Sequence, residues 1–133
     1  MVGKILATLD AIGATENTVI AFASDHGEML GERGMWFKKH FFELALRVPL
    51  FFNAPSIAPQ RVREFASLVD LLPTLMGLAA GSPWTSETEN LEGIDLTKYF
   101  GKADAPAERE IYAEYTAKPP RHRSSWCVRG ATS

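Results

Sequence analysis

The sequence predicts an α/β fold in which helices flank a mainly parallel sheet. Apolar residues recur at helical spacing over about residues 2–12, and Gly13 follows as a C-cap. After a short connection at residues 14–17, residues 18–23 form a continuous apolar, partly β-branched run, which is the pattern of a strand buried on both faces. A helix, a short loop and a buried strand in this order are typical of one arm of a parallel α/β sheet.

The later segments continue this alternation. A second apolar run covers residues 47–52, and Pro49 restricts it to an edge strand or to a strand that begins after the proline. Asp70 is expected to be the N-cap of a helix that ends at Gly81, with Pro73 in the first turn, where backbone N–H groups have no partner within the helix. The remaining expected elements are an irregular loop at 28–43, a polar loop at 82–90, a short element at 91–100 and a strand at 109–115.

Size, charge and cysteine content exclude several classes of protein. The 133 residues can fill one domain with a core, but not two. The net charge of −2 gives no basic excess for nucleic acid or a membrane surface, and no apolar run approaches the roughly 18 residues of a transmembrane helix. A single cysteine, Cys127, excludes an internal disulfide, and the N-terminus does not have the pattern of a signal peptide. A cytoplasmic location is therefore the default expectation.

Ser24, Asp25, His26 and Gly27 come directly after the predicted strand. In open α/β sheets, ligands bind at the carboxyl ends of strands, and Asp and His are common metal ligands. An isolated Asp-His pair is nevertheless structural more often than not, with Asp25 capping the next turn. Gly27 favours the functional interpretation, because glycine lets the backbone turn sharply and approach a ligand closely.

The stretch from Ser24 to Lys38 resembles a segment of type I sulfatases that reads S-D-H-G-x-x-L-G-E-x-G-x-W-x-K. It is similar in particular to the segment of choline sulfatases. The resemblance covers roughly residues 1–116. Three further segments agree with it, namely Arg47-Val48-Pro49-Leu50, the run from Leu68 to Leu75, and the run from Leu91 to Leu96.

This resemblance implies part of an alkaline-phosphatase-like fold that binds a divalent cation, usually Ca²⁺, with Mn²⁺ or Mg²⁺ as alternatives. It implies that the carboxylate of Asp25 coordinates the metal, that His26 occupies the adjacent metal- or substrate-binding position, and that Lys38 is a catalytic residue that binds a sulfate oxygen or the bridging oxygen. A metal ion and an ammonium group would offset the charge of a sulfuryl group and stabilise charge that grows on the leaving oxygen. The implied substrate is a small sulfate ester, either choline sulfate or an aryl sulfate, and family members are often oligomeric.

Each of these assignments has a structural alternative. Lys39 stands beside Lys38, and either could be a solvated surface lysine, but only Lys38 fits the W-x-K spacing. Trp36 and Phe37 are expected to pack within the loop rather than contact substrate, and Glu32 is expected to be structural or solvent-facing.

The residues that would complete the site are missing from the sequence. The sulfatase nucleophile arises from the Cys or Ser of a C/S-x-P-x-R motif, and no such motif occurs here, since Cys127 is followed by Val128 and Arg129. The chain is therefore expected to be inactive alone. We expect residues 1–81 to belong to the catalytic core, residues 82–116 to begin a C-terminal subdomain, and residues 117–133 to be a disordered or out-of-frame tail.

Two further hypotheses remain open. One is a phosphonate or phosphodiester hydrolase of the same superfamily. The other is a non-catalytic module that completes a split enzyme. In either case a strand at 18–23 without neighbours would expose a sheet edge and an apolar patch.

Overall fold

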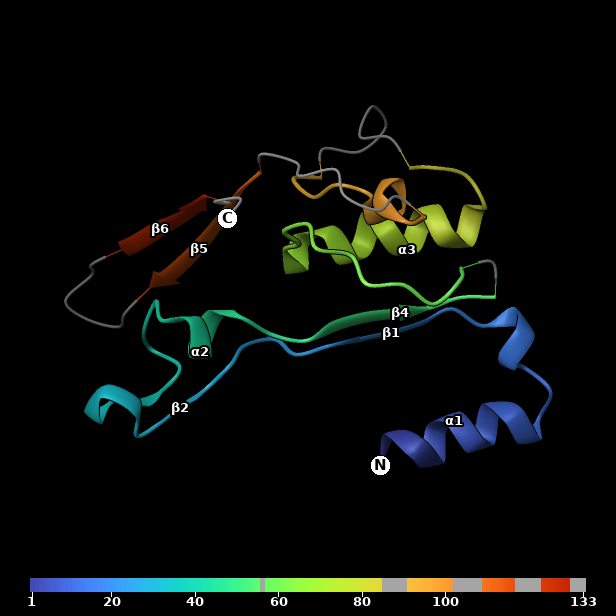
Figure 1. The fold of residues 1–133 in the computed structure, drawn as a ribbon, viewed down its shortest axis with the longest axis horizontal. Coiled ribbons are helices and arrows are strands. Elements are labelled where there is room, and N and C mark those ends of the chain that lie inside the picture. The colour runs from blue at the N-terminus through green and yellow to red at the C-terminus, as the bar shows by residue number, and fades with distance from the viewer. Residues whose placement is uncertain (56, 85–90, 102–108, 117–122, 130–133) are drawn as a thin grey trace.

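A computed structural model describes residues 1–55, 57–84, 91–101, 109–116 and 123–129. The structure is mixed α/β, and Figure 1 shows β1 and β4 running through its middle, with α1 on one side and α3 on the other. The helices are α1 (Val2–Ala11), α2 (Glu43–Leu46) and α3 (Leu71–Ala80). The strands are β1 (Ile20–Ala23), β2 (Met29–Leu30), β3 (Trp36–Phe37), β4 (Leu50–Asn53), β5 (Glu110–Thr116) and β6 (Arg123–Arg129). Short 3₁₀ turns are η1 (Thr15–Asn17), η2 (Glu32–Gly34), η3 (Leu68–Asp70) and η4 (Leu96–Tyr99).

The end of α1 is fixed by local chemistry. Ile12 is the C-cap, and Gly13 follows with a φ of +68°, a left-handed conformation that costs glycine little. The N–H of Gly13 donates to the carbonyl of Asp10 at 3.0 Å, and the N–H of Ala14 donates to that of Leu9 at 2.9 Å. This pair of bonds is the Schellman motif. The predicted helix and its glycine cap are confirmed.

The strand β1 pairs with β4 in antiparallel orientation, with Ile20 opposite Asn53 and Ala23 opposite Leu50. A parallel pair needs a crossover that carries the chain back to the starting end, usually a full helix. The segment between β1 and β4 instead reverses the chain direction, and it holds the short β2–β3 hairpin and the four-residue helix α2. Among the described residues, the expected parallel neighbour of β1 is thus replaced by an antiparallel one. The predicted start of the second strand after Pro49 is confirmed.

The two faces of the β1–β4 pair differ in what covers them. Side chains alternate between the faces of a strand, so Phe22 and Phe51 share one face, and their rings lie 5.8 Å apart. Phe52 is on the other face and lies 6.1 Å from the ring of Phe100. Phe22 is 42% exposed and Phe51 is 62% exposed. The predicted burial of this strand on both faces is therefore wrong for the chain as described, because Phe22 on β1 and Phe51 opposite it are both exposed. The predicted apolar patch is present.

The start of α3 differs in detail from the prediction. Asp70 belongs to the turn η3, which follows Ser67, and its carboxylate accepts the backbone N–H of Ser67 at 2.7 Å as half of a capping box. Pro73 lies in the first turn of α3, as expected of a residue without an N–H, and it is fully buried. Gly81 ends the helix with a φ of +65°. Asp70 is the N-cap of α3 by position, as predicted, but its carboxylate accepts the N–H of Ser67 and none from the first turn of α3.

A polar seam joins α3 to the segment around η4. The hydroxyl of Thr74 accepts the N–H of Leu96 at 2.9 Å, and the carboxylate of Asp95 accepts the N–H of Trp84 at 2.9 Å. Gly77 faces the same carboxylate so closely that a Cβ would collide with it. Buried polar groups are tolerated because they are hydrogen-bonded, and these bonds fix the position of the segment on the helix.

The last described elements are β5 and β6, which form an antiparallel pair with Glu110 opposite Arg129. The strand predicted at 109–115 is confirmed with slightly shifted ends. Within the predicted tail of residues 117–133, the part that forms β6 is a strand instead of a disordered segment, and the rest lies outside the described residues. None of the helices in the described ranges is long and apolar enough to cross a membrane.

Candidate metal and anion site

Asp25 and His26 lie in the turn that directly follows β1. Asp25 Oδ1 accepts the backbone N–H of His26 at 3.0 Å, and the hydroxyl of Ser24 donates to the carbonyl of His26 at 2.8 Å. These bonds hold the turn, as the structural interpretation of the pair expects. The side chain of Asp25 nevertheless remains 84% exposed, so the turn orients the carboxylate without covering it.

The imidazole of His26 is oriented by the backbone. Its Nδ1 lies 2.7 Å from the carbonyl oxygen of Gly27. Because a carbonyl only accepts, Nδ1 carries the proton, and in the neutral ring Nε2 holds a lone pair. Nε2 lies 3.5 Å from Asp25 Oδ2. Two electron-rich atoms this close repel each other unless a proton or a cation joins them. A backbone carbonyl on the other ring nitrogen is also the arrangement that orients metal-bound histidines.

The packing of the turn against α2 requires a glycine at position 27. Its N–H donates to the carbonyl of Ala45 at 2.9 Å, and the N–H of Glu28 donates to that of Leu44 at 3.0 Å. A Cβ on Gly27 would collide with the carbonyl of Leu44. The close approach predicted for this glycine therefore occurs, but toward the backbone of α2. This contact fixes the turn after β1 against the helix.

Lys38 is positioned by the β2–β3 hairpin. Met29 pairs with Phe37 in antiparallel register, and Lys38 follows Phe37 directly at the end of β3. Lys38 is exposed, and Phe37 before it has a φ of +72°, which is unusual for a bulky residue and turns the chain as it leaves β3. The hairpin thus brings Lys38 back toward β2, which begins three residues after His26. Its ammonium makes no hydrogen bond or ion pair with Asp25 or His26 among the interactions of the described residues.

The neighbouring side chains have structural roles. Glu32 Oε2 accepts the N–H of Leu30 at 2.7 Å, and this bond lowers the pKa of Glu32 below its usual value. The indole of Trp36 lies over Gly31, which has a φ of +116°. The predicted structural role of Glu32 is confirmed. Trp36 is 59% exposed and Phe37 is 67% exposed, so packing within the loop stays a prediction for both.

Within the described part of the chain, the candidate metal ligands are two residues, Asp25 and His26. No third His, Cys, Asp or Glu gathers with Asp25 and His26 there. Hard divalent cations such as Ca²⁺ take six to eight oxygen ligands. The pair fits part of a metal site, and further ligands would have to come from elsewhere.

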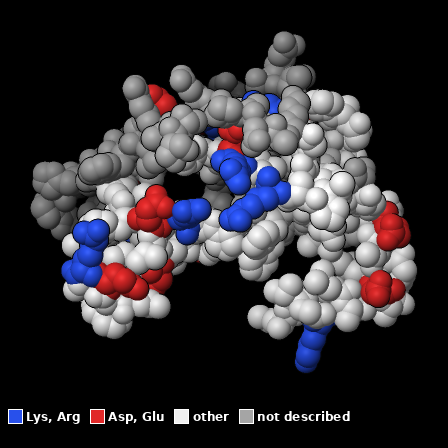
Figure 2. Space-filling model, in the orientation of Figure 1, with Lys and Arg blue, Asp and Glu red and all other residues white. Residues whose placement is uncertain are grey.

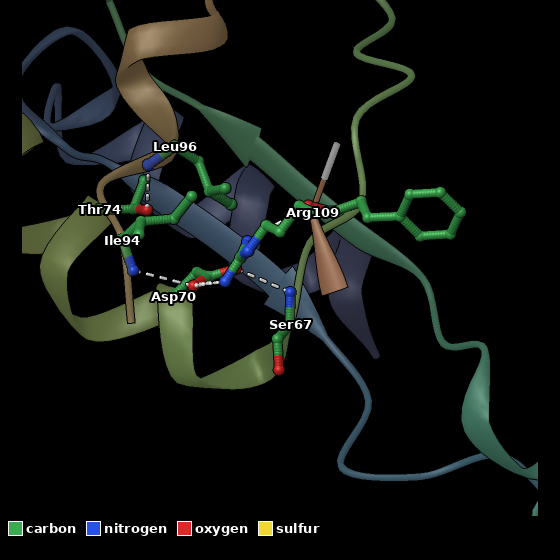
Figure 3. Close-up of polar contacts among 7 residues, drawn as sticks. Ser67, Asp70, Thr74, Ile94, Leu96 and Arg109 are labelled. Carbon is green, nitrogen blue, oxygen red and sulfur yellow. Dashed lines mark hydrogen bonds and ion pairs between the residues drawn. The ribbon is translucent and has the colours of Figure 1, made fainter. Parts of the chain in front are cut away.

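Sequence reasoning missed the most buried charged contact, between Asp70 and Arg109 (Figure 3). Arg109 donates to both carboxylate oxygens of Asp70, at 2.6 and 2.7 Å, and Ile94 adds a backbone N–H at 2.9 Å. Burial raises the pKa of Asp70, but the hydrogen bonds from Arg109, Ile94 and Ser67 lower it by more, so the net pKa lies below its usual value. This network joins η3 to the start of β5. It is a structural contact and lies apart from the Asp25–His26 turn in sequence.

The sulfatase family model matches residues 1–82, which include both Asp25–His26 and Lys38. The chain belongs to the sulfatase family. A curated relative, the choline-sulfatase of Rhizobium meliloti (strain 1021), is 47% identical over 105 residues, which is 73% of this chain and 20% of that protein. The chain therefore spans about a fifth of the length of this relative.

Two solved structures place this sulfatase segment within a larger fold. A protein in complex with its substrate D-glucosamine-2-N,6-O-disulfate is 28% identical, with a TM-score of 0.73 over 96% of this chain and 26% of that one. The phosphonate monoester hydrolase of Silicibacter pomeroyi is also 28% identical, with a TM-score of 0.75 over 90% of this chain and 23% of that one. The predicted fold class is confirmed: the chain is part of a larger alkaline-phosphatase-like α/β domain.

Proposed function

We propose that this chain carries the metal-binding and anion-binding part of a sulfuric ester hydrolase of the choline-sulfatase type. The observation that carries the proposal is the 3.5 Å approach of His26 Nε2 to Asp25 Oδ2 at the carboxyl end of β1. A cation between these atoms would remove their repulsion, and the proton that Gly27 fixes on Nδ1 leaves Nε2 free to bind it. Family membership and the 47% identity to a choline-sulfatase support a sulfate ester as substrate.

The proposed chemistry assigns one task to each residue. Asp25 and His26 would hold a divalent cation, Ca²⁺ in the first instance with Mn²⁺ or Mg²⁺ as alternatives, and that cation would withdraw charge from the sulfuryl oxygens. Lys38 would bind a sulfate oxygen or the bridging oxygen, where its ammonium stabilises the charge that grows as the ester bond breaks. The chain would be inactive alone, because its 133 residues contain no C/S-x-P-x-R motif.

A chimera provides the test. In the choline-sulfatase of Rhizobium meliloti, the stretch that matches this chain is replaced by this chain. We expect the chimera to hydrolyse choline sulfate and to lose activity on chelation, whereas the isolated chain is inactive. Asp25→Asn should reduce both bound metal and kcat/KM at least about tenfold. Asp10→Asn, an exposed carboxylate of α1, serves as the matched control and should change neither quantity.

Two outcomes would contradict the proposal. If the isolated chain hydrolysed choline sulfate or an aryl sulfate at enzyme-like rates, the argument from the missing nucleophile would be wrong. If Asp25→Asn left the metal content of the chimera unchanged, Asp25 would not be a ligand.

The alternative substrate class has support of its own. The phosphonate monoester hydrolase of Silicibacter pomeroyi resembles the chain with a TM-score of 0.75, close to the 0.73 of the complex with a sulfated sugar. Sulfate and phosphonate esters both present anionic oxygens to a cation and an ammonium group. Assaying the chimera with a phosphonate monoester beside choline sulfate and an aryl sulfate separates the two substrate classes, and a preference for the phosphonate would favour the alternative.

Other features of the whole protein are proposals as well. They are assembly into oligomers, a cytoplasmic location consistent with the single Cys127, and the division into residues 1–81, 82–116 and 117–133. A non-catalytic module that completes a split enzyme remains the second functional candidate, and the exposed Phe22 and Phe51 favour it.

A further inference from the structure

Lys38 lies in the segment from Arg33 to Phe42, which we call the Lys38 loop. The loop starts within the turn η2 and ends directly before α2. The carbonyl of Phe42 accepts the N–H of Ala45 at 2.9 Å, so the end of the loop is fixed to the first turn of this helix. The carbonyl of Ala45 in turn accepts the N–H of Gly27 at 2.9 Å, which ties α2 to the turn after β1.

The backbone of the Lys38 loop is strained at two places. Arg33 has a φ of +58° and Phe37 has a φ of +72°, and these are the only non-glycine residues with a positive φ in the described ranges. Residues with a Cβ rarely adopt this conformation, and it persists where surrounding contacts hold it, often at functional sites. Because Phe37 directly precedes Lys38, the direction in which the lysine leaves β3 depends on the contacts that hold the loop.

A side-chain contact joins the two ends of the loop. The guanidinium of Arg33 lies over the ring of Phe42, with Cζ 5.0 Å from the ring centroid. At this distance the negative face of an aromatic ring attracts a cation. The imidazole of His40 lies 6.3 Å from the same ring. Since Phe42 is fixed to α2, the contact holds the strained start of the loop at this helix.

The loop lies at a charged end of the molecule. In Figure 2, acidic and basic side chains gather over the end that holds β2 and α2. Arg33, Lys38 and Lys39 are exposed cations of the loop, and the segment from Arg33 to Phe42 contains no Asp or Glu. A carboxylate partner for Arg33 within this segment would repel an anionic ester beside Lys38. A neutral ring instead holds the guanidinium and leaves the positive charge of the loop intact.

We propose that Arg33 is a positioning residue for Lys38, and that its contact with Phe42 holds the Lys38 loop so that the ammonium reaches an anion bound beside Asp25 and His26. Arg33 does not touch the substrate in this arrangement and acts through Lys38. The inference rests on the proposed function for the role of Lys38, whereas the closure of the loop is measurable without it.

A double-mutant cycle in the chimera with the Rhizobium meliloti enzyme tests the link to Lys38. Arg33→Ala should lower kcat/KM for choline sulfate about tenfold, and Arg33→Lys, which keeps a cation for the ring, should lower it less than about threefold. In the Lys38→Ala background, Arg33→Ala should change kcat/KM less than about twofold, because the effects of coupled residues do not add. Arg61→Ala is the matched control, since Arg61 is exposed and lies outside the loop, and it should have little effect in either background. A tenfold loss from Arg33→Ala in both backgrounds would show that Arg33 does not act through Lys38 and would overturn the proposal.

Hydrogen exchange tests the closure of the loop without relying on activity. In the isolated chain and in the chimera, Arg33→Ala should speed the exchange of the β2–β3 amides at least about fivefold, while exchange in α1 should change little. Phe42→Leu removes the ring, keeps an apolar side chain and should have the same effect, because the ring is what attracts the guanidinium. Unchanged exchange in both variants would overturn the proposal.

The two measurements also separate this proposal from the proposed function. A chimera that hydrolyses no ester, but in which Arg33→Ala speeds exchange in β2–β3, would support the closure of the loop and refute the proposed function. An active chimera in which Arg33→Ala changes neither exchange nor kcat/KM would support the function and refute the role of Arg33.

Discussion

Arg109 holds Asp70 through two parallel hydrogen bonds of 2.6 and 2.7 Å, and the aspartate is completely buried. The two residues are 39 positions apart and join the start of α3 to the start of β5. Bidentate contacts between a guanidinium and a carboxylate combine charge with fixed geometry. The pair therefore fixes the start of β5 against the start of α3, and its removal should destabilise the contact between these elements.

The first prediction concerns this pair. Arg109→Ala should lower the free energy of unfolding by about 3 kcal/mol, because it leaves a buried carboxylate without its counter-charge. Urea unfolding followed by the helical circular dichroism signal measures the change. Arg47→Ala is the matched control, since Arg47 lies 3.8 Å from Glu43 with both side chains exposed, and it should cost at most about 0.5 kcal/mol. Equal losses of unfolding free energy in the two variants would show that the buried pair stabilises the fold no more than the exposed pair does.

The second prediction is the pH dependence that the same carboxylate produces. The pKa of Asp70 is lowered in the folded state, because the bonds from Arg109, Ile94 and Ser67 outweigh the effect of burial. The unfolded chain therefore binds the proton more readily, so stability is fully present above pH 3.8, the ordinary pKa of the group, and falls as the pH drops below it toward the folded pKa. Unfolding measured between pH 2 and 6 should show this loss, and Asp70→Asn should flatten it. An unchanged slope in Asp70→Asn would assign the acid sensitivity to other groups.

The third prediction compares two glycines in helices. Gly77→Ala should lower the free energy of unfolding by about 1–3 kcal/mol, because the new methyl group would collide with the carboxylate of Asp95. Gly3→Ala in α1 has open space around it and should instead stabilise the chain by about 0.5–1 kcal/mol. Thermal unfolding of both variants gives the comparison. Stabilisation by Gly77→Ala would mean that the seam between α3 and Asp95 is not closely packed.

Local features of the fold were accessible from the sequence. The cap at Gly13, the place of Pro73 in its helix and the start of β4 after Pro49 each follow from the backbone chemistry of one or two residues. The Asp25–His26 turn was accessible too, because polar residues directly follow an apolar run. These predictions required no knowledge of distant partners.

Relationships between distant segments could not be predicted in the same way. Asp70 has the pattern of a helix cap, and nothing near it in the sequence indicates that Arg109 will meet it. The apolar pattern of β1 reflects the environment of a complete sheet, so it predicts burial that Phe22 does not have among the described residues. Gly27 indicates a close approach, but only the structure identifies α2 as the element that approaches.

The last prediction separates Lys38 from its neighbour Lys39. Both are exposed, but Lys38 directly follows β3 and alone fits the W-x-K spacing. In the chimera, Lys38→Ala should lower kcat/KM for choline sulfate by about 10²–10³, the usual cost of removing a group that stabilises transition-state charge. Lys39→Ala removes the same charge one residue further along and should change it less than about threefold, since an exposed charge outside the site has little effect. Metal content should be unchanged in both variants. Equal losses of kcat/KM in the two variants would show that Lys38 acts only through its net charge. A larger loss in Lys39→Ala would show that Lys39 is the anion-binding residue.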